Sequence, residues 1–199
     1  MRRILIVIDM QKDFIDGALA NPDAQAIVKP MADLISRFFG DIIFTRDTHD
    51  YNYLNTAEGK NLPIEHCIDG TIGWTIHQDL VNSARESHPD MSHVYVFNKS
   101  TFGAASALAS EITSNIYSEA GMNNTTIYVC GTCTDICVVS NVLGLKEHLP
   151  EAEICVIEDL CAGLTKEKHD AAIEVMKSCQ VVALSSKDVR CGVNGGIKL

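Results

Sequence analysis

Short apolar runs rich in β-branched residues alternate with helical patterns along almost the whole chain, and this alternation constrains the fold more than any other feature. The runs predict six strands, at residues 3–9, 41–46, 93–99, 125–131, 153–158 and 180–184. The patterns between them predict helices near residues 23–39, 74–86, 104–120, 135–148 and 166–179. Strands that are apolar on both faces and are separated by helices form parallel sheets covered on both sides. We therefore expect a three-layer α/β/α sandwich around a doubly wound, mainly parallel six-stranded sheet.

The length, charge and first residues of the chain limit its class. A chain of 199 residues fits one domain, which we place at residues 1–199. A net charge of −10, without clusters of Lys and Arg, argues against nucleic acid as a partner. The apolar run at the start is short and ends at Asp9 with no cleavage pattern, so we interpret it as a first strand and expect a cytoplasmic protein with no membrane partner.

Eight cysteines raise the question of disulfides or a metal cluster. Several of them lie inside apolar runs of a chain that is large enough to fold without covalent staples, which favours reduced and mostly buried thiols. The spacing of Cys130, Cys133 and Cys137 leaves an iron–sulfur or zinc site as an alternative, but no further pair of ligands follows at a suitable distance.

Four reactive side chains follow four predicted strands. Asp9 ends the first strand, Asp47 and Lys99 end the next two, and Cys137 follows the fourth across a tight turn. Ligands of open parallel sheets bind beyond the carboxyl ends of the strands, so we expect these groups to meet at one edge. The long irregular stretch at residues 47–73 exceeds the usual length of a connection and suits a wall of the same site.

Cys137 is placed for nucleophilic chemistry. The pair Thr134 and Asp135 offers helix caps, which sets the thiol in the first turn of a helix. Free backbone N–H groups and the helix dipole at that position are expected to lower the thiol pKa. A cysteine nucleophile also needs a base and a supporting cation, and Asp9 and Lys99 are the candidates.

Three segments resemble the signature segments of the isochorismatase-like cysteine hydrolases, a superfamily that includes the nicotinamidases. They are Asp-Met-Gln-Lys-Asp-Phe at residues 9–14, Lys-Ser-Thr-Phe-Gly at 99–103, and Gly-Thr-Cys-Thr-Asp-Ile-Cys-Val at 131–138. They occur in the order of the family, and the resemblance covers nearly the whole chain.

The resemblance implies a catalytic triad of Asp9, Lys99 and Cys137. It also implies a cis peptide bond at Thr132–Cys133 and an oxyanion hole formed by the backbone N–H groups of Cys133 and Cys137. The implied reaction is transfer of an acyl group to the Cys137 sulfur, release of ammonia or an amine, and hydrolysis of the thioester.

The long stretch carries a ligand set suited to zinc, with iron or manganese as alternatives. Its members are two carboxylates and two imidazoles, from Asp47, His49, Glu58 and His66. This pattern is similar to the metal site of nicotinamidases, including those with Glu where others have a third His. Tyr53 stands at the common third-His position, which favours Glu58. Isochorismatases proper need no metal, so the pattern argues against that branch.

Aromatic side chains are expected to complete a pocket for a planar substrate. Phe14 and Phe102 fall where the family places ring-packing aromatics. The pocket Trp of the family falls near Leu62 or Pro63 in this chain, a departure that bears on the substrate. For Trp74 we expect a role in packing or in a subunit contact.

The leading hypothesis is a metal-dependent cysteine amidase that converts nicotinamide to nicotinate and ammonia. The alternative keeps the triad and changes the substrate to another small amide, such as a carbamoyl or ureido compound. Two other classes are a binding module that retains the fold and a redox role for the Cys130, Cys133 and Cys137 cluster. Family members often form dimers or higher oligomers, which implies a homo-oligomer.

Overall fold

The computed structural model describes residues 2–116 and 119–191, and the predicted α/β fold is confirmed. Six strands form one sheet in the order β3-β2-β1-β4-β5-β6, and all five neighbouring pairs are parallel. The strands are β1 (Arg2–Ile8), β2 (Asp41–Asp47), β3 (Val94–Lys99), β4 (Thr125–Thr132), β5 (Glu153–Ala162) and β6 (Val182–Leu184).

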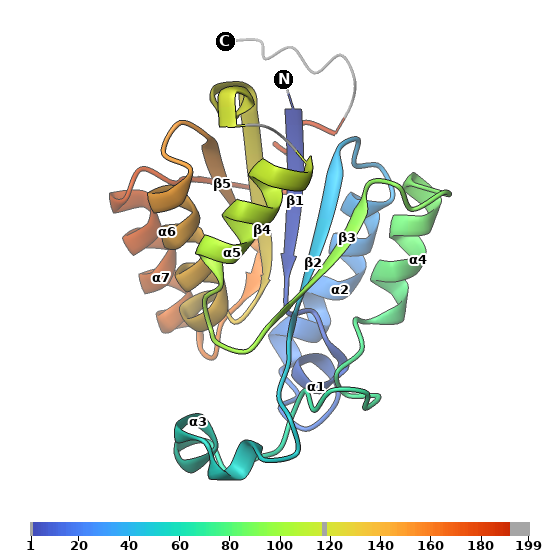
Figure 1. The fold of residues 1–199 in the computed structure, drawn as a ribbon, viewed down its shortest axis with the longest axis vertical. Coiled ribbons are helices and arrows are strands. Elements are labelled where there is room, and N and C mark those ends of the chain that lie inside the picture. Colours follow the sequence, from blue (N-terminus) through green and yellow to red (C-terminus); the bar gives the residue numbers. More distant parts are fainter. Residues whose placement is uncertain (1, 117–118, 192–199) are drawn as a thin grey trace.

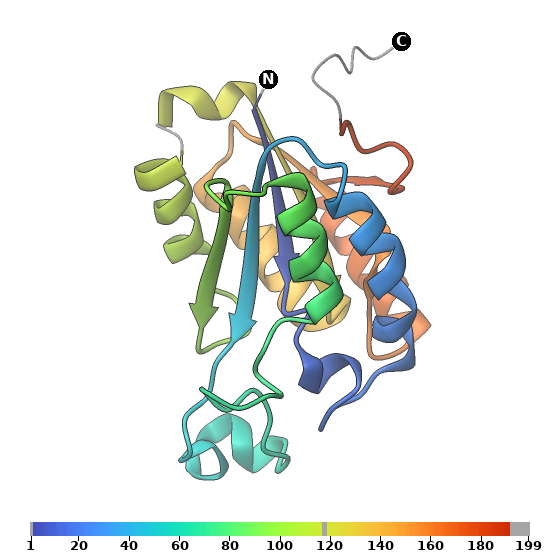
Figure 2. The same ribbon diagram turned by 90° about the vertical axis from the view of Figure 1, so that its right-hand side faces the viewer.

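Helices cover both faces of the sheet (Figures 1 and 2). One face carries α2 (Pro22–Ile35) and α4 (Gln78–Ser87), and the other carries α5 (Ala105–Glu111), α6 (Val139–His148) and α7 (Lys166–Ser178). Local sequence sets the start of α2, because the Asn21 side chain accepts hydrogen bonds from the backbone N–H groups of Asp23 and Ala24. None of the helices in the described ranges combines the length and the apolarity that a membrane span requires.

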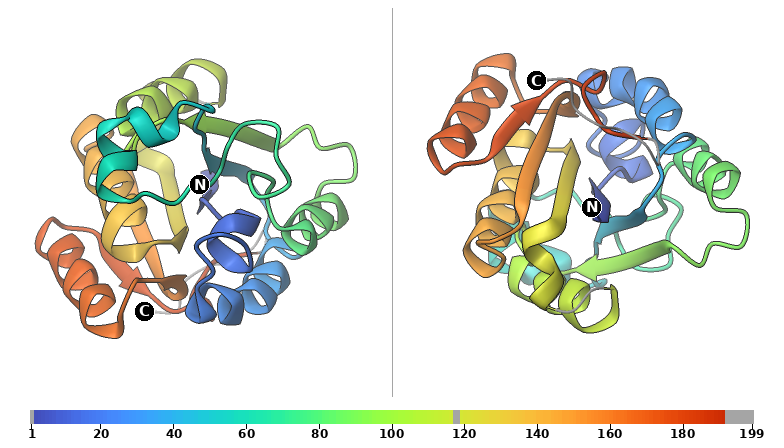
Figure 3. Two further views of the ribbon diagram at one scale, coloured as in Figure 1. Left: turned by 90° about the horizontal axis from the view of Figure 1, so that it is seen from below. Right: turned by 90° about the horizontal axis from the view of Figure 1, so that it is seen from above.

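The stretch at residues 47–73, predicted as irregular, contains two short helical segments. They are η1 (Tyr53–Asn55) and α3 (Ala57–Asn61), and the Thr56 side chain caps α3 by accepting a hydrogen bond from the Gly59 N–H group. This segment lies beyond the carboxyl ends of the strands (Figures 1 and 3). A further short helix, α1 (Lys12–Ile15), follows β1 and was not predicted either. Turns this short lack the apolar periodicity from which helices are predicted.

Several predicted helices have different bounds in the structure; α2, predicted to reach residue 39, ends at Ile35, and α6, predicted from residue 135, begins at Val139. The predicted helix at residues 104–120 is α5 up to Glu111, followed by a wide helical turn, η2 (Ile112–Ile116), and a 3-10 helix, η3 (Glu119–Asn124); residues 117–118 lie outside the described ranges. The predicted helix at 74–86 begins only at Gln78, because the preceding His77 acts as the N-cap.

The order of the strands reverses between β1 and β4, and these two strands form the centre of the core. Ile4 to Ile8 have no exposed surface, and every residue of β4 is buried. β1 runs in register with β4, with Ile8 opposite Gly131. A reversal of this kind opens a crevice at the carboxyl ends of the strands, where doubly wound proteins bind their ligands.

Gly131 makes the close approach of β4 to β1 possible. Its φ is +125°, and a Cβ atom at this position would lie 2.1 Å from the Ile8 carbonyl oxygen. The register of β4 against β5 also shifts between Val129 and Gly131. A side chain at this position therefore cannot be accommodated without moving the backbone that leads into Asp9 and Cys133.

We expect Gly131→Ala to lower the free energy of unfolding by about 3 kcal/mol or more, because it combines a steric clash with an unfavourable backbone conformation. Gly70→Ala is the matched control, since Gly70 has a φ of +78° but no atom lies within 4 Å of the point that its Cβ atom would occupy. Gly70→Ala should lower the free energy of unfolding by only about 1 kcal/mol. Chemical denaturation of both variants tests this, and equal losses would contradict the steric argument.

Candidate active site

Asp9, Lys99 and Cys137 lie together at the carboxyl edge of the sheet. The Lys99 Nζ atom is 2.6 Å from Asp9 Oδ2 and 3.6 Å from the Cys137 sulfur. The side chains of Asp9 and Lys99 have no exposed surface. Asp9 has a φ of +49°, in the left-handed region that Asp tolerates better than most residues. A carboxylate, an ammonium group and a thiol thus share one buried position.

Burial and the neighbouring side chains shift the pKa of the Asp9 carboxyl. Burial raises its pKa, the positive charge of Lys99 and a hydrogen bond from Thr45 lower it, and the nearby Asp47 raises it, with a net upward direction. The Thr45 hydroxyl donates to Asp9 Oδ1 at 2.7 Å. A carboxyl with a raised pKa is a better proton acceptor than an ordinary one.

The Cys137 thiol differs from the expectation of a lowered pKa. Burial raises its pKa, Asp9 and Asp47 raise it further, and Lys99 only partly opposes them. Cys137 lies in η4 (Thr134–Val138), a wide helical turn that continues into α6, and is 6% exposed. The expectation was wrong in direction because it considered the backbone dipole and omitted burial and the adjacent carboxylate. The thiol is therefore protonated at rest, with a base beside it.

The peptide bond between Thr132 and Cys133 is cis, as the resemblance implied. Cys133 forms the N-cap of η4, where its carbonyl oxygen accepts hydrogen bonds from the N–H groups of Ile136 and Val138. This places the Cys133 backbone at the start of the turn that carries the nucleophile. All eight cysteines are free thiols, including Cys133 and Cys137.

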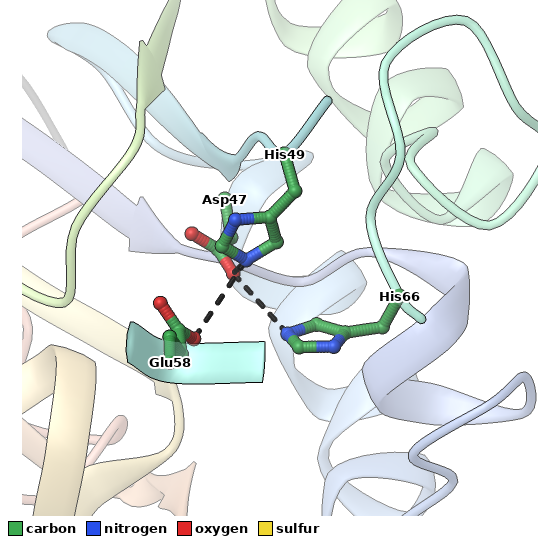
Figure 4. A group of neighbouring side chains, drawn as sticks. All are labelled: Asp47, His49, Glu58 and His66. Carbon is green, nitrogen blue, oxygen red and sulfur yellow. Dashed lines mark hydrogen bonds and ion pairs between the residues drawn. The ribbon is translucent and has the colours of Figure 1, made fainter. Parts of the chain in front are cut away.

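The four predicted metal ligands also come together. Asp47, His49, Glu58 and His66 each offer a ligand atom, and these atoms lie within 4.8 Å of one another (Figure 4). His49 Nε2 lies 2.9 Å from Asp47 Oδ2 and 3.7 Å from Glu58 Oε1. Two imidazoles and two carboxylates form a donor set that suits zinc, iron or manganese.

The His66 ring is oriented for coordination. Its Nδ1 atom lies 2.8 Å from the Ile64 carbonyl oxygen, which can only accept a hydrogen bond. Nδ1 therefore carries a proton, and Nε2 is the ring nitrogen that faces the cluster, 3.6 Å from Asp47 Oδ2. The ring is 2% exposed and packs edge-on against Phe14.

The Tyr53 ring packs beside the ligand set, but its hydroxyl hydrogen bond is made outside that set. The hydroxyl donates to the Leu62 carbonyl oxygen at 3.0 Å, and the ring centroid lies 4.6 Å from that of His49. Burial and the neighbouring carboxylates raise the pKa of Tyr53 to about 12. Its hydroxyl stays protonated at neutral pH, so the carboxylate of Glu58 completes the donor set.

Asp47 belongs to both groups of side chains. Its Oδ2 atom faces the two histidines, while its Oδ1 atom lies 3.4 Å from Lys99 Nζ. Burial raises its pKa, but hydrogen bonds with His49 and His66 and the charge of Lys99 outweigh burial and hold the pKa well below its usual range. The metal ligand set and the triad are therefore one continuous polar network.

A cavity of about 220 Å³ opens onto this network. The predicted ring-packing residues Phe14 and Phe102 both line it, as do Cys133 and Cys137. Leu62, near which the pocket Trp of the family falls, lines it as well. Trp74 packs elsewhere, with its indole N–H donating to Thr48 and the Arg46 guanidinium 3.6 Å above its ring.

Several buried or half-buried polar side chains support the site and were not predicted. The Gln11 amide bonds both the N–H and the carbonyl oxygen of Asp47, and the Asp13 carboxylate accepts from the Cys67 N–H next to His66. Both belong to the segment that begins at Asp9, so their position in that motif was an available signal. No local pattern marks Thr45 or Asn141, because their partners are distant in sequence.

Comparison with known proteins places the chain in a family. The Isochorismatase domain matches residues 3–188. The nicotinamidase/pyrazinamidase of Mycobacterium tuberculosis is 26% identical over 92% of this chain and 99% of its own length. The nicotinamidase of Acinetobacter baylyi is 29% identical, with 93% of each chain covered.

Among solved structures, the pyrazinamidase of Pyrococcus horikoshii in complex with zinc is 25% identical, with a TM-score of 0.74 over 93% of this chain and 99% of that one. The prediction of an amide-hydrolysing enzyme of this superfamily is confirmed, and the chain belongs to the isochorismatase domain family.

Proposed function

We propose that this chain is a metal-dependent cysteine amidase that converts nicotinamide to nicotinate and ammonia. The observation that carries the proposal is one small cavity that is lined both by Cys137 and by three of the four ligand residues, Asp47, Glu58 and His66. Both groups are needed to hold a planar amide and to attack it, and Asp47 connects them.

The acylation step follows from the geometry of the triad. The Cys137 thiol gives its proton to Asp9, and the sulfur attacks the carbonyl carbon of the amide. Asp9 then passes the proton to the departing nitrogen, which leaves as ammonia. Lys99 lies 2.6 Å from Asp9 and 3.6 Å from the sulfur, so its positive charge stabilises the negative charge both on the Asp9 carboxylate and on the Cys137 thiolate.

The backbone N–H groups of Cys133 and Cys137 are the proposed oxyanion hole. Donors of this kind are worth about 3 to 4 kcal/mol each when they are aimed at the developing charge. In the second half of the reaction Asp9 accepts a proton from water, and the resulting hydroxide attacks the thioester. The acid product leaves, and the Cys137 thiol regains its proton.

A divalent metal, zinc in the first place, fits the four ligand residues. Asp47, His49, Glu58 and His66 would hold it through two nitrogen and two oxygen atoms. A divalent ion held there would supply a Lewis acid toward a ring nitrogen of the substrate. The relatives support this assignment, because the zinc-bound Pyrococcus horikoshii pyrazinamidase shares the fold.

The character of the cavity favours an uncharged planar amide over a carbamoyl or ureido acid. Its volume of about 220 Å³ lies below the range of about 300–1,000 Å³ typical of larger ligands. Two aromatic rings line it, and among its described lining residues no Lys or Arg stands ready to pair with a substrate carboxylate. The cytoplasmic location, the single domain and the homo-oligomeric state stay predictions from the sequence.

The first prediction separates the nucleophile from its neighbouring cysteine. Cys137→Ser should lower nicotinamide turnover by at least about 10³-fold, because the hydroxyl is a far weaker nucleophile. Cys133→Ser is the matched control and should stay within about threefold of wild type, since only its backbone N–H is used. Ammonia release measures both. Loss of activity in Cys133→Ser with retention in Cys137→Ser would favour the redox alternative.

The second prediction concerns the metal. His66→Ala should lower the affinity for zinc by at least about tenfold, because one buried ligand is removed. Elemental analysis of the purified variant measures metal per chain independently of activity. His77→Ala is the control, since His77 caps α4 outside the cluster. Equal metal content in both variants would exclude His66 as a ligand.

The third prediction concerns pH. Asp9 must be ionised to act as base, and its pKa is raised, so activity should fall as the pH drops through a value above the usual carboxyl pKa of about 4. Thr45→Val removes a hydrogen bond that lowers the Asp9 pKa, so this acidic limb should move to higher pH. Thr126→Val, at the opposite end of the sheet, should leave it in place. The pH profile of kcat/KM measures the limb, and an identical limb in Thr45→Val would exclude Asp9 as the titrating group.

A further inference from the structure

Asn141 connects the two segments that form the cavity. It lies on α6 and has no exposed surface. Its Nδ2 atom donates to the Cys137 carbonyl oxygen at 2.7 Å and to the Phe102 carbonyl oxygen at 3.0 Å, and its Oδ1 atom accepts from the Ala104 N–H at 2.9 Å. One amide therefore ties the segment that carries the nucleophile to the segment that carries an aromatic wall.

The orientation of this amide is fixed by its partners. Two carbonyl oxygens lie on the nitrogen side and one N–H group lies on the oxygen side, so a flipped amide would place like groups against each other. Both hydrogens of Nδ2 are used. A buried amide whose hydrogen bonds are all made is held in one orientation. It therefore fixes the positions of the backbone groups that it bonds in both segments.

The segment of residues 100–104 has few other attachments near Phe102. Its Thr101 carbonyl oxygen accepts from Lys99 Nζ at 3.2 Å, and its Thr101 hydroxyl donates to Gly103 within the same segment. A Cβ atom added at Gly103 would lie 3.2 Å from the Ser140 Cβ atom on α6, so the segment runs close to this helix at Gly103. The Phe102 side chain is 49% exposed, so packing alone does not hold the ring over the cavity.

We propose that Asn141 is a positioning residue for the amidase reaction: it fixes the Phe102 ring relative to the Cys137 sulfur. The inference rests on the proposed function and adds a residue that touches neither substrate nor metal. It acts on binding of the planar ring, so its loss raises KM more than it lowers kcat.

The test is a double-mutant cycle between Asn141→Leu and Phe102→Ala with nicotinamide as substrate. In the wild-type background Asn141→Leu should raise KM about tenfold, because the ring is no longer held in place. In the Phe102→Ala background the same change should alter KM by less than about twofold, since the ring through which Asn141 acts is absent. Equal effects in the two backgrounds would overturn the proposal.

Two further variants separate positioning from stability. Asn141→Asp keeps the acceptor for Ala104 and loses both donors, so it provides a second folded variant with the same expected rise in KM if Asn141→Leu does not fold. Ser140→Ala removes the hydrogen bond that the Ser140 hydroxyl donates to the Ile136 carbonyl oxygen, and it should leave KM unchanged. A lower melting temperature in Asn141→Asp with unchanged KM would reduce the role of Asn141 to stability.

A readout without nicotinamide distinguishes failure of this inference from failure of the proposed function. N-phenylmaleimide and N-methylmaleimide alkylate thiols and differ in the planar ring. Mass spectrometry of the Cys137 peptide gives the ratio of their rates. The rate with N-phenylmaleimide divided by the rate with N-methylmaleimide should fall equally in Asn141→Leu and in Phe102→Ala. The double variant should show the same reduced ratio as either single variant. An unchanged ratio in Asn141→Leu would contradict the proposal, whatever the natural substrate is.

Discussion

The buried ion pair between Asp9 and Lys99 is the interaction on which the site depends. Its two atoms are 2.6 Å apart, and neither side chain has exposed surface. Breaking such a pair is costly, because the remaining charge is left buried without a partner. The parallel sheet makes the pair possible, since β1 and β3 end at the same edge, and the turn after β4 brings the Cys137 sulfur to 3.6 Å from Lys99 Nζ. Burial then raises the pKa of the thiol, and Asp9 stands ready to receive its proton.

Asp47 extends this network to the metal ligand set. One of its oxygens lies 3.4 Å from Lys99 and the other 2.9 Å from His49. The Lys99 ammonium group therefore pairs with both the Asp9 and the Asp47 carboxylates. One positive charge cannot balance two negative charges, and the excess negative charge lies at Asp47, next to the histidines of the ligand set. A divalent cation at the four ligands would complete the balance of charge. This balance of charge gives a physical reason why a metal site would lie directly beside Cys137.

Sequence reasoning identified the strands and the residues at their ends because both depend on local signals. Runs of β-branched residues marked the sheet, Asp9 and Lys99 ended two of them, and Cys137 followed another across a tight turn. The contacts of Gln11, Thr45 and Asn141 were not predicted, since each bonds a partner about 36 or more residues away. The pKa of Cys137 was predicted in the wrong direction because it is raised by burial and by carboxylates that come from other strands, neither of which is a local signal. The helical turns at Tyr53–Asn55 and Ala57–Asn61 are too short to show periodicity.

The central claim is that the amide is cleaved through a thioester on Cys137. The most direct test is acid quenching of the zinc-loaded protein during turnover of nicotinamide, followed by mass spectrometry of the peptide that contains Cys137. The account predicts a nicotinoyl group on the Cys137 sulfur. A nicotinoyl group on any other residue, or nicotinamide turnover at the wild-type rate in a variant that lacks the Cys137 thiol, would contradict it.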